Sequence, residues 1–390
     1  MTNGPMESDG RGISAFAGRI ASTSRRPSNI GGSIAAGAIS LAMGEPWEGT
    51  PAPIVEAAIG ALRAGRTRYS PLAGSPSLQQ AIVAHLRARH AREWSTDSVV
   101  CTHGASAGLA AAVLATVNPG DKVVLPEPTY SLYADHVAMA SGFVAWVANR
   151  RDGSLDVERI CAELAGARMV VLCSPGNPTG AVVGQEDLER ISDAAALAGA
   201  YLLCDEAYSD IVFDGVAFFS SLDLQSSDHV ICCSTFSKTY AMTGWRLGYV
   251  IAEPTVAAAI NLVHRSFNGA LSTFVQDAGV VALETPPEEL HDHSLAYQVR
   301  RDMVLAELGG IPNVTVMPPE GAFYAFVRVD SAATSEELVA LCAEAGVLVR
   351  SGLEYGPSGE GAFRISFATG VEELTVGLSR VALVLRGVTQ

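Results

Sequence analysis

The sequence has little that would build a metal site or a disulfide framework. Its seven cysteines show no CxxC spacing and mostly lie within apolar runs, at positions 101, 161, 173, 204, 232, 233 and 342. Cysteines in such runs are typical of small buried hydrophobic residues in a reducing compartment. The histidines do not cluster with them in the sequence, so we predict no metal ion.

Long apolar runs are also absent. No segment approaches the length of a membrane-spanning helix. The first residues carry glycine, serine and charged side chains, without the apolar stretch of a secretory signal. We therefore expect a cytoplasmic protein that makes no contact with a membrane.

Positive charge is scarce, because 26 lysines and arginines face 41 acidic residues and the formal net charge is −15. A nucleic-acid surface needs clustered cations, so this balance argues against one. The short basic runs at 66–68, 87–92 and 300–301 are interpreted as solvated helix faces or ends. The chain has 390 residues, of which 48% are hydrophobic, so it can bury a large core. Its length suggests two domains.

Three apolar segments each end abruptly in polar residues. Residues 169–173 precede Ser-Pro-Gly-Asn-Pro-Thr-Gly, residues 201–204 precede Asp-Glu-Ala-Tyr, and residues 230–233 precede Ser-Thr-Phe-Ser-Lys. Their length and composition predict buried strands. Open α/β sheets bind ligands at the carboxyl ends of their strands, so these polar residues are candidate site residues.

Lys238 is the most informative of them. It lies between small hydroxyl residues, with Arg246 eight positions further on. A lysine that forms a Schiff base must be held on a rigid element, and hydroxyls with a guanidinium can bind a phosphate. On its own, a Ser-Lys pair is more often a surface feature.

A second candidate phosphate site is the turn at 102–109, Thr-His-Gly-Ala-Ser-Ala-Gly-Leu. It follows an apolar strand and opens a helical run, so backbone N–H groups of the first helical turn would be free to bind an anion. Taken alone, this segment is more often a tight turn.

Together and in this order, these segments resemble the fold-type I pyridoxal phosphate enzymes. Within that group the chain is similar to class I/II aminotransferases of the aspartate aminotransferase superfamily. The similarity begins at 41–46 (Leu-Ala-Met-Gly-Glu-Pro), continues through 68–74 (Arg-Tyr-Ser-Pro-Leu-Ala-Gly) and reaches 363–366 (Phe-Arg-Ile-Ser). It covers most of the chain.

The resemblance implies pyridoxal 5′-phosphate as cofactor and a role for each matching residue. Lys238 would hold the cofactor as an aldimine and move the substrate's α-proton. Asp205 would pair with the pyridinium nitrogen, while Asn177 and Tyr208 would bind the ring's 3-oxygen. The phosphate would be bound by Gly104, Ala105, Ser106, Thr235, Ser237 and Arg246.

Three further roles follow from the same resemblance. Tyr130 would stack on the cofactor ring. Tyr69 would reach the phosphate of a partner subunit, which implies a homodimer with shared sites. Arg364 would bind the substrate carboxylate through both of its terminal nitrogens, with Gly44 and Asn177 beside it. A structural ion pair is the alternative role for Arg364.

The expected fold is α/β. Alternation of helical stretches, such as 77–90 and 185–198, with apolar strands predicts a large domain with a mostly parallel sheet between helices, over 44–290. A smaller α+β domain is expected over 291–390, joined by an N-terminal arm at 1–43. Compared with the family that it resembles, the segment between Pro27 and Gly44 is short, so we expect it to lack much of the helix usual there.

The function expected from the resemblance is transfer of an amino group between an α-amino acid and a 2-oxo acid. A β-eliminating carbon–sulfur lyase, or a specialised biosynthetic enzyme acting on an amino acid, would use the same residues. An effector-sensing transcription factor needs an added DNA-binding domain, for which the arm is too short. The stretch 264–269 is expected near the pocket for the substrate side chain. Arg265 in this stretch could suggest a dicarboxylate substrate, although a lone arginine beside a helix end is more often a surface residue or part of an ion pair. The sequence names no particular amino acid.

Overall fold

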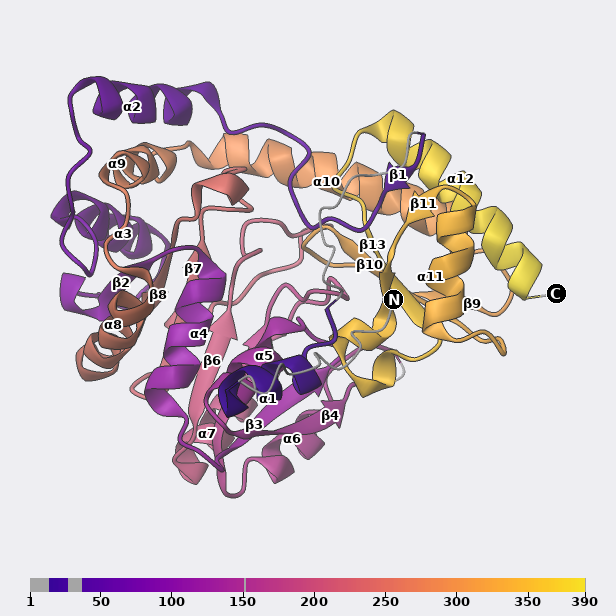
Figure 1. Ribbon diagram of the computed structural model, residues 1–390, viewed down its shortest axis with the longest axis horizontal. Helices are drawn as coiled ribbons and strands as arrows, with labels where there is room; N and C mark the ends of the chain where they lie inside the picture. Colours follow the sequence, from indigo (N-terminus) through magenta and orange to yellow (C-terminus); the bar gives the residue numbers. More distant parts are fainter. Residues whose placement is uncertain (1–13, 27–36, 151, 390) are drawn as a thin grey trace.

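The computed structural model describes residues 14–26, 37–150 and 152–389, and its elements are grouped around two main sheets (Figure 1). The larger sheet has seven strands in the order β2-β8-β7-β6-β5-β3-β4. Its strands are β2 (Val99–Thr102), β3 (Lys122–Glu127), β4 (Phe143–Ala148), β5 (Ala167–Cys173), β6 (Tyr201–Asp205), β7 (Val230–Thr235) and β8 (Gly248–Ile251). β8 runs antiparallel to both neighbours, and the other pairs are parallel. The predicted mostly parallel sheet is therefore confirmed.

Helices cover both faces of this sheet. Along β3, Val123 and Leu125 pack into one apolar cluster and Val124 into another, as the two-residue repeat of a strand requires. The covering helices are α2 (Ala52–Arg63), α3 (Pro76–Arg89), α4 (Ala105–Thr116), α5 (Leu132–Met139), α6 (Val157–Glu163), α7 (Gln185–Ala198), α8 (Pro254–Asn268) and α9 (Thr273–Ala282). A parallel sheet buried on both faces explains why its strands read as continuous apolar runs.

The second sheet has four antiparallel strands in the order β12-β13-β10-β9. They are β9 (Val314–Val316), β10 (Tyr324–Val329), β12 (Arg350–Ser351) and β13 (Ala362–Ser366). Around them lie α10 (Pro287–Leu308), α11 (Ser335–Glu344) and α12 (Val371–Val388). Figure 1 shows α10 extending from one group of elements to the other. We propose 44–290 and 291–390 as the limits of the two domains.

The N-terminal segment contributes to the second group of elements. β1 (Ile39–Ser40) pairs in parallel with β11 (Val347–Leu348), and Leu41 is fully buried in the core shared with Phe323 and Phe363. The predicted arm also contains a helix that sequence analysis missed, α1 (Ala15–Thr23), whose N-cap is Ser14. The stretch expected to be short for the family lies largely outside the described residues.

Arg300 and Arg301 correct one sequence interpretation, because they are not solvated. Each side chain is about 5% exposed. Arg300 donates to the carbonyls of Ala296 and Thr369, and its guanidinium lies over the Trp47 ring. Arg301 is paired with Asp214 at 2.7 Å. Burial of these two side chains is possible because their donors are satisfied, and a sequence pattern does not reveal such partners.

The strand registers bring the candidate site residues together. Cys173 at the end of β5 faces Asp205 at the end of β6, and Asp205 faces Cys233 on β7. The segments that follow these strands therefore leave the sheet at one edge. Short 3₁₀ helices occur in the connections: η1 (Thr96–Ser98), η2 (Ser221–Asp223), η3 (Thr243–Trp245), η4 (Gly352–Tyr355) and η5 (Pro357–Gly359).

Candidate active site

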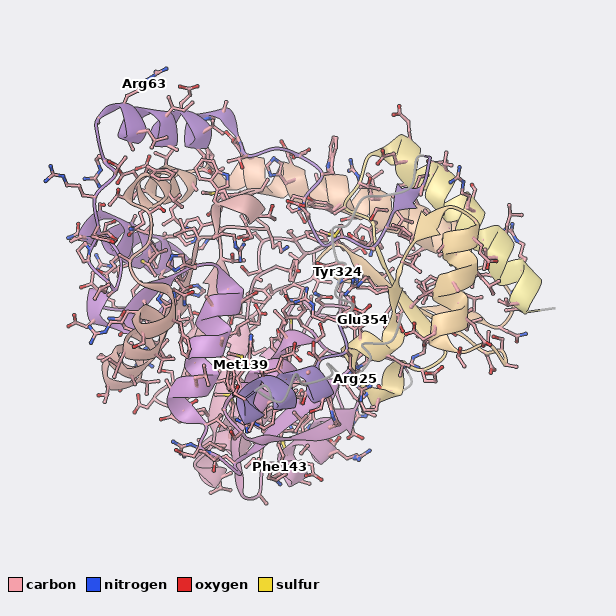
Figure 2. All side chains as sticks on the ribbon, viewed as in Figure 1. Arg25, Arg63, Met139, Phe143, Tyr324 and Glu354 are labelled. Atoms are coloured by element: carbon pink, nitrogen blue, oxygen red, sulfur yellow. The ribbon has the colours of Figure 1, made fainter. Side chains whose placement is uncertain are left out.

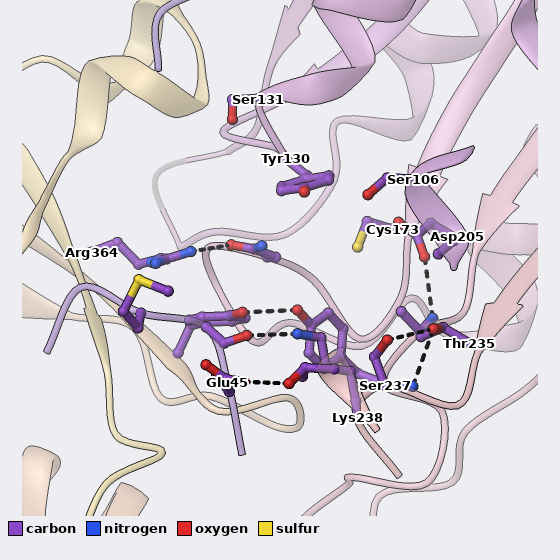
Figure 3. Close-up of a pocket in the computed structure, with 18 of the residues that line it drawn as sticks. Glu45, Ser106, Tyr130, Ser131, Cys173, Asp205, Thr235, Ser237, Lys238 and Arg364 are labelled. Carbon is purple, nitrogen blue, oxygen red and sulfur yellow. Dashed lines mark hydrogen bonds between the residues drawn. The ribbon is translucent and has the colours of Figure 1, made fainter. Parts of the chain in front are cut away.

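A cavity of about 380 Å³ lies at this edge, and residues of both groups of elements line it. Twelve residues predicted from the sequence line it: Gly44, Ala105, Ser106, Tyr130, Asn177, Asp205, Tyr208, Thr235, Ser237, Lys238, Arg246 and Arg364. In the close-up, Arg364 lies at one side, Asp205 and Thr235 at the other, and Tyr130 above Lys238 (Figure 3). These twelve residues share one cavity although they come from many parts of the chain, whereas Gly104, the N-cap of α4, is not among the lining residues.

Lys238 lies on the segment that follows β7, and its Nζ donates to the Gly44 carbonyl at 2.6 Å. Nζ also lies 5.8 Å from the centre of the Tyr208 ring and 5.6 Å from that of Phe323. Burial, helped by the nearby Arg364 charge, lowers the pKa of Lys238 to about 8. Near neutral pH a useful fraction of the amine is therefore uncharged and nucleophilic.

Asp205 ends β6 and is only 4% exposed. Its Oδ2 accepts a hydrogen bond from the Tyr133 hydroxyl at 2.7 Å, and its Oδ1 accepts from the Ala207 N–H at 3.2 Å. Burial raises the pKa of Asp205 to about 6 in spite of these donors. A buried carboxylate of this kind is suited to a cationic partner within the cavity.

Tyr133 was missed by sequence analysis. It is fully buried on α5, three residues after Tyr130, and the two rings meet edge to face with centroids 5.5 Å apart. Tyr130 lies two residues before α5 begins, and Tyr133 lies in the first turn of that helix. Helical spacing therefore does not relate the two residues, and the contact of Tyr133 with Asp205 follows from the place where α5 packs.

The N-terminus of α4 is built to receive an anion. Gly104, its N-cap, has no side-chain capping bond, so the first-turn N–H groups remain available. A Cβ at Gly104 would lie 2.7 Å from Nη2 of Arg246, and one at Gly248 would lie 2.9 Å from the Ala105 nitrogen. Only glycine allows this close approach of the backbone to the Arg246 guanidinium.

Three side chains complete the anion-binding corner. Arg246 takes a left-handed backbone conformation, with φ of 56°, and its Nη1 donates to the Thr243 carbonyl at 2.7 Å. The Thr235 and Ser237 hydroxyls are 2.9 Å apart. A guanidinium, two hydroxyls and free N–H groups are suitable donors for a phosphate.

Arg364 lies on β13 and is 5% exposed. Its Nη1 donates to Asn177 Oδ1 at 3.0 Å, and its Nη2 donates to the Ala42 carbonyl at 2.5 Å. Among the described residues no carboxylate lies within ion-pair distance of Arg364, and its buried Nε has no partner. The alternative role as a structural ion pair finds no partner in the described part of the chain.

Tyr324 connects these groups and was also missed by sequence analysis. Its hydroxyl is 2.8 Å from that of Tyr208, and the Arg364 guanidinium lies 4.3 Å from the centre of its ring. A Cβ at Gly44 would lie 2.0 Å from the Tyr324 hydroxyl, so glycine is required there. No sequence pattern relates Tyr324 to Arg364, because antiparallel pairing of β10 with β13 brings them together.

Two predicted features lie away from the cavity within this chain. Tyr69 is 96% exposed. The stretch 264–269 was expected near the side-chain pocket, and none of its residues lines the cavity within this chain. His264 is instead buried on α8, where its Nε2 accepts from the His103 N–H at 3.2 Å.

The donor set of the cavity fits pyridoxal phosphate. An amine, a buried carboxylate, an aromatic face and a phosphate-binding corner lie around one volume. A metal would need different ligands, and no group of three or more His, Cys, Asp or Glu side chains within residues 14–26, 37–150 and 152–389 is arranged to hold one. Within these ranges no helix has the length and apolar character needed to cross a membrane.

Comparisons of this chain with known proteins all point to one family. The model of the family "Aminotransferase class I and II" matches residues 36–381. An aspartate aminotransferase of Pyrococcus horikoshii is 33% identical over 356 residues, covering 90% of this chain and 91% of its own length. An arginine–pyruvate transaminase of Pseudomonas aeruginosa is 32% identical and covers 88% of each chain.

Among solved structures, an aromatic aminotransferase of Pyrococcus horikoshii superposes with a TM-score of 0.88 at 30% identity, covering 96% of this chain and 99% of its own. The names of these relatives differ in the amino acid but agree in the reaction. The chain therefore belongs to the class I and II aminotransferases, the fold-type I enzymes that use pyridoxal phosphate to transfer an amino group between an amino acid and a 2-oxo acid.

Proposed function

We propose that Lys238 and Arg364 divide the work of this aminotransferase between proton transfer and substrate orientation. The main support is that two functional groups line one cavity. They are the Lys238 amine, whose pKa is lowered, and the buried Arg364 guanidinium, which has no carboxylate partner among the described residues. Arg364 binds the α-carboxylate of the substrate, beside Gly44 and Asn177. Lys238 Nζ holds the cofactor and, once displaced, takes the proton from the substrate Cα.

The remaining residues hold and tune the cofactor. Bound pyridoxal phosphate supplies an electron sink that stabilises negative charge at the substrate Cα. Asp205 keeps the ring nitrogen protonated, Tyr208 and Asn177 bind the 3-oxygen, and Tyr130 stacks on the ring. Gly104, Ala105, Ser106, Thr235, Ser237 and Arg246 bind the phosphate.

The reaction type is tested by supplying an amino donor without an acceptor. We expect the holoenzyme to release no more than one equivalent of 2-oxo acid per site, because the amino group then stays on the cofactor. Adding a 2-oxo acid should restart turnover. A product that accumulates in many-fold excess over sites without an acceptor would instead indicate the β-eliminating lyase.

We also propose a C₂ homodimer in which Tyr69 completes the site of the partner subunit. The support is the resemblance of the segment 68–74 to the family, together with the 96% exposure of Tyr69, which leaves its side chain accessible to a second copy of the chain. Because most of the seven cysteines are buried and all are free, we further propose a reducing compartment such as the cytoplasm.

The shared site is tested by mixing two impaired variants. Tyr69→Phe and Lys238→Ala should each lose activity, by about 10-fold and almost completely, respectively. Mixed dimers contain one site that carries both wild-type residues, so partial activity should return as subunits exchange. Steady-state rates before and after incubation measure this recovery. A fully active monomer in sedimentation experiments would contradict the proposal.

A further inference from the structure

Arg26 is a cation in the cavity wall to which the proposed chemistry gives no role. It lies just after α1, is half-buried, and lines the cavity. Its guanidinium carbon lies 6.0 Å from the centre of the Tyr130 ring. The side chain therefore reaches the cavity on the side where Tyr130 faces it.

The position of Arg26 is set by the packing of α1 on α5. Arg19 Nε donates to the Ala138 carbonyl at 3.3 Å, and Ser24 Oγ donates to Asp135 Oδ2 at 3.0 Å. Because α5 begins two residues after Tyr130, one helix positions both the tyrosine and the segment that carries Arg26. The N-terminal segment thus supplies a cation to the cavity at a fixed place.

The charges around Arg26 leave it available for an anion. Arg350 and Glu354 pair with each other, and Arg364 is held by Asn177 and Ala42. Asp135 accepts from Ser24, and Glu45, at another part of the wall, accepts from Thr243. Within the described ranges, no carboxylate lies within the 4 Å of an ion pair with Arg26.

Asp135 and Glu354 are nonetheless close enough to interact with Arg26 at longer range. Burial raises the pKa of Asp135, and Ser24 and Arg26 oppose this shift. Burial likewise raises the pKa of Glu354, against the charges of Arg350, Arg364 and Arg26. The negative charge of Glu354 is balanced by its closer partner, Arg350. Glu354 would therefore repel a substrate anion bound at Arg26 only weakly.

The proposed substrate orientation gives Arg26 a target. With the α-carboxylate on Arg364 and the α-nitrogen toward Lys238, the substrate side chain faces the remaining wall of the cavity. We propose that Arg26 binds an anionic group at the far end of that side chain and so selects acidic amino acids and their 2-oxo acids. This specificity role rests on the proposed role of Arg364.

The test compares binding of two four-carbon acids to the holoenzyme, succinate with two carboxylates and butyrate with one. Calorimetry measures both and needs no turnover. We expect Arg26→Gln to weaken succinate binding about 10- to 50-fold, as loss of a charge-assisted contact predicts, and to leave butyrate binding unchanged. Arg26→Lys should retain part of the succinate preference, because it keeps the charge but loses the planar fork.

Two further variants separate this role from a general effect of charge or folding. Arg25→Gln removes the same charge one position away, where the guanidinium donates to the Leu353 carbonyl and does not line the cavity. Figure 2 shows Arg25 beyond the end of α1. This control should bind succinate as the wild type does. Ser24→Ala should weaken succinate binding less than Arg26→Gln, because it only loosens the segment that positions Arg26.

Equal losses of succinate and butyrate in Arg26→Gln would overturn the proposal, since Arg26 would then support the site as a whole. Normal succinate binding by Arg26→Gln would also overturn the proposal. So would a wild-type preference for 3-phenylpropionate over succinate, because Arg26 would then stack on aromatic groups of the ligand. Arg364→Lys provides the separate test of the underlying function. If that change left binding of both acids intact, the assigned α-carboxylate site would be wrong.

Discussion

Replacing Lys238 with alanine is expected to lower turnover by at least about 10⁴-fold, because the change removes the group that transfers the proton as well as the covalent attachment of the cofactor. The phosphate should still bind, since Thr235, Arg246 and the Gly104 turn are untouched. Single-turnover rates, together with cofactor retention measured by absorbance, separate these two effects. Loss of the cofactor and of activity in parallel would contradict this division of roles.

Borohydride reduction gives an independent check on Lys238. The sequence contains only two lysines, Lys122 and Lys238, so peptide mapping has two side-chain candidates. Lys122 lies at the start of β3, where its Nζ donates to the Ala165 carbonyl at 2.9 Å, and it does not line the cavity. Lys122→Ala is therefore the matched control. It should leave the reduced adduct and the activity unchanged, and an adduct on Lys122 would refute the assignment.

The lowered pKa of Lys238 predicts how cofactor capture depends on pH. The reactive form is the neutral amine, so capture by the cofactor-free protein should accelerate as pH rises toward about 8 and level off above it. An ordinary lysine would keep gaining reactivity up to about pH 10.4. Stopped-flow absorbance between pH 6 and 10 measures the difference. A rate that levels off only near pH 10 would show that burial does not lower this pKa.

The residues at the strand ends could be predicted from the sequence for a physical reason. Strands buried on both faces form uninterrupted apolar runs, so their ends are easy to locate, and parallel strands bring those ends to one edge. Asn177, Asp205 and Lys238 each follow such a run, and all three line the cavity. The family resemblance added Gly44 and Arg364, which no local pattern connects to the others.

The residues missed by sequence analysis depend on contacts made between distant segments. Tyr324 reaches Tyr208 across 116 positions, and Tyr133 reaches Asp205 across 72. Arg26 enters the cavity because α1 packs on α5, and the composition of the arm did not indicate a helix. Such contacts depend on how whole helices and strands pack against one another, so hydrophobic periodicity and motif spacing cannot predict them.

Replacing Arg364 with lysine is expected to impair amino-acid turnover strongly while leaving the spectrum of the bound cofactor almost unchanged. Lysine keeps the positive charge but loses the planar fork that Arg364 presents between Asn177 and Ala42. Loss of this geometry should cost on the order of 2–4 kcal/mol, roughly a 30- to 1,000-fold drop in kcat/KM. Steady-state kinetics with an amino acid measure the drop directly.

A primary amine without a carboxylate is the control that makes this result specific. Its slow half-reaction, followed by cofactor absorbance in a single turnover, should proceed equally in the wild type and in Arg364→Lys, because the amine makes no contact with the guanidinium. The buried Arg364 Nε has no partner among the described residues, so a structural role would have to act through Asn177 and Ala42 alone. Such a role would slow the amine and the amino acid by the same factor. A selective loss with the amino acid therefore identifies Arg364 as the residue that recognises the α-carboxylate.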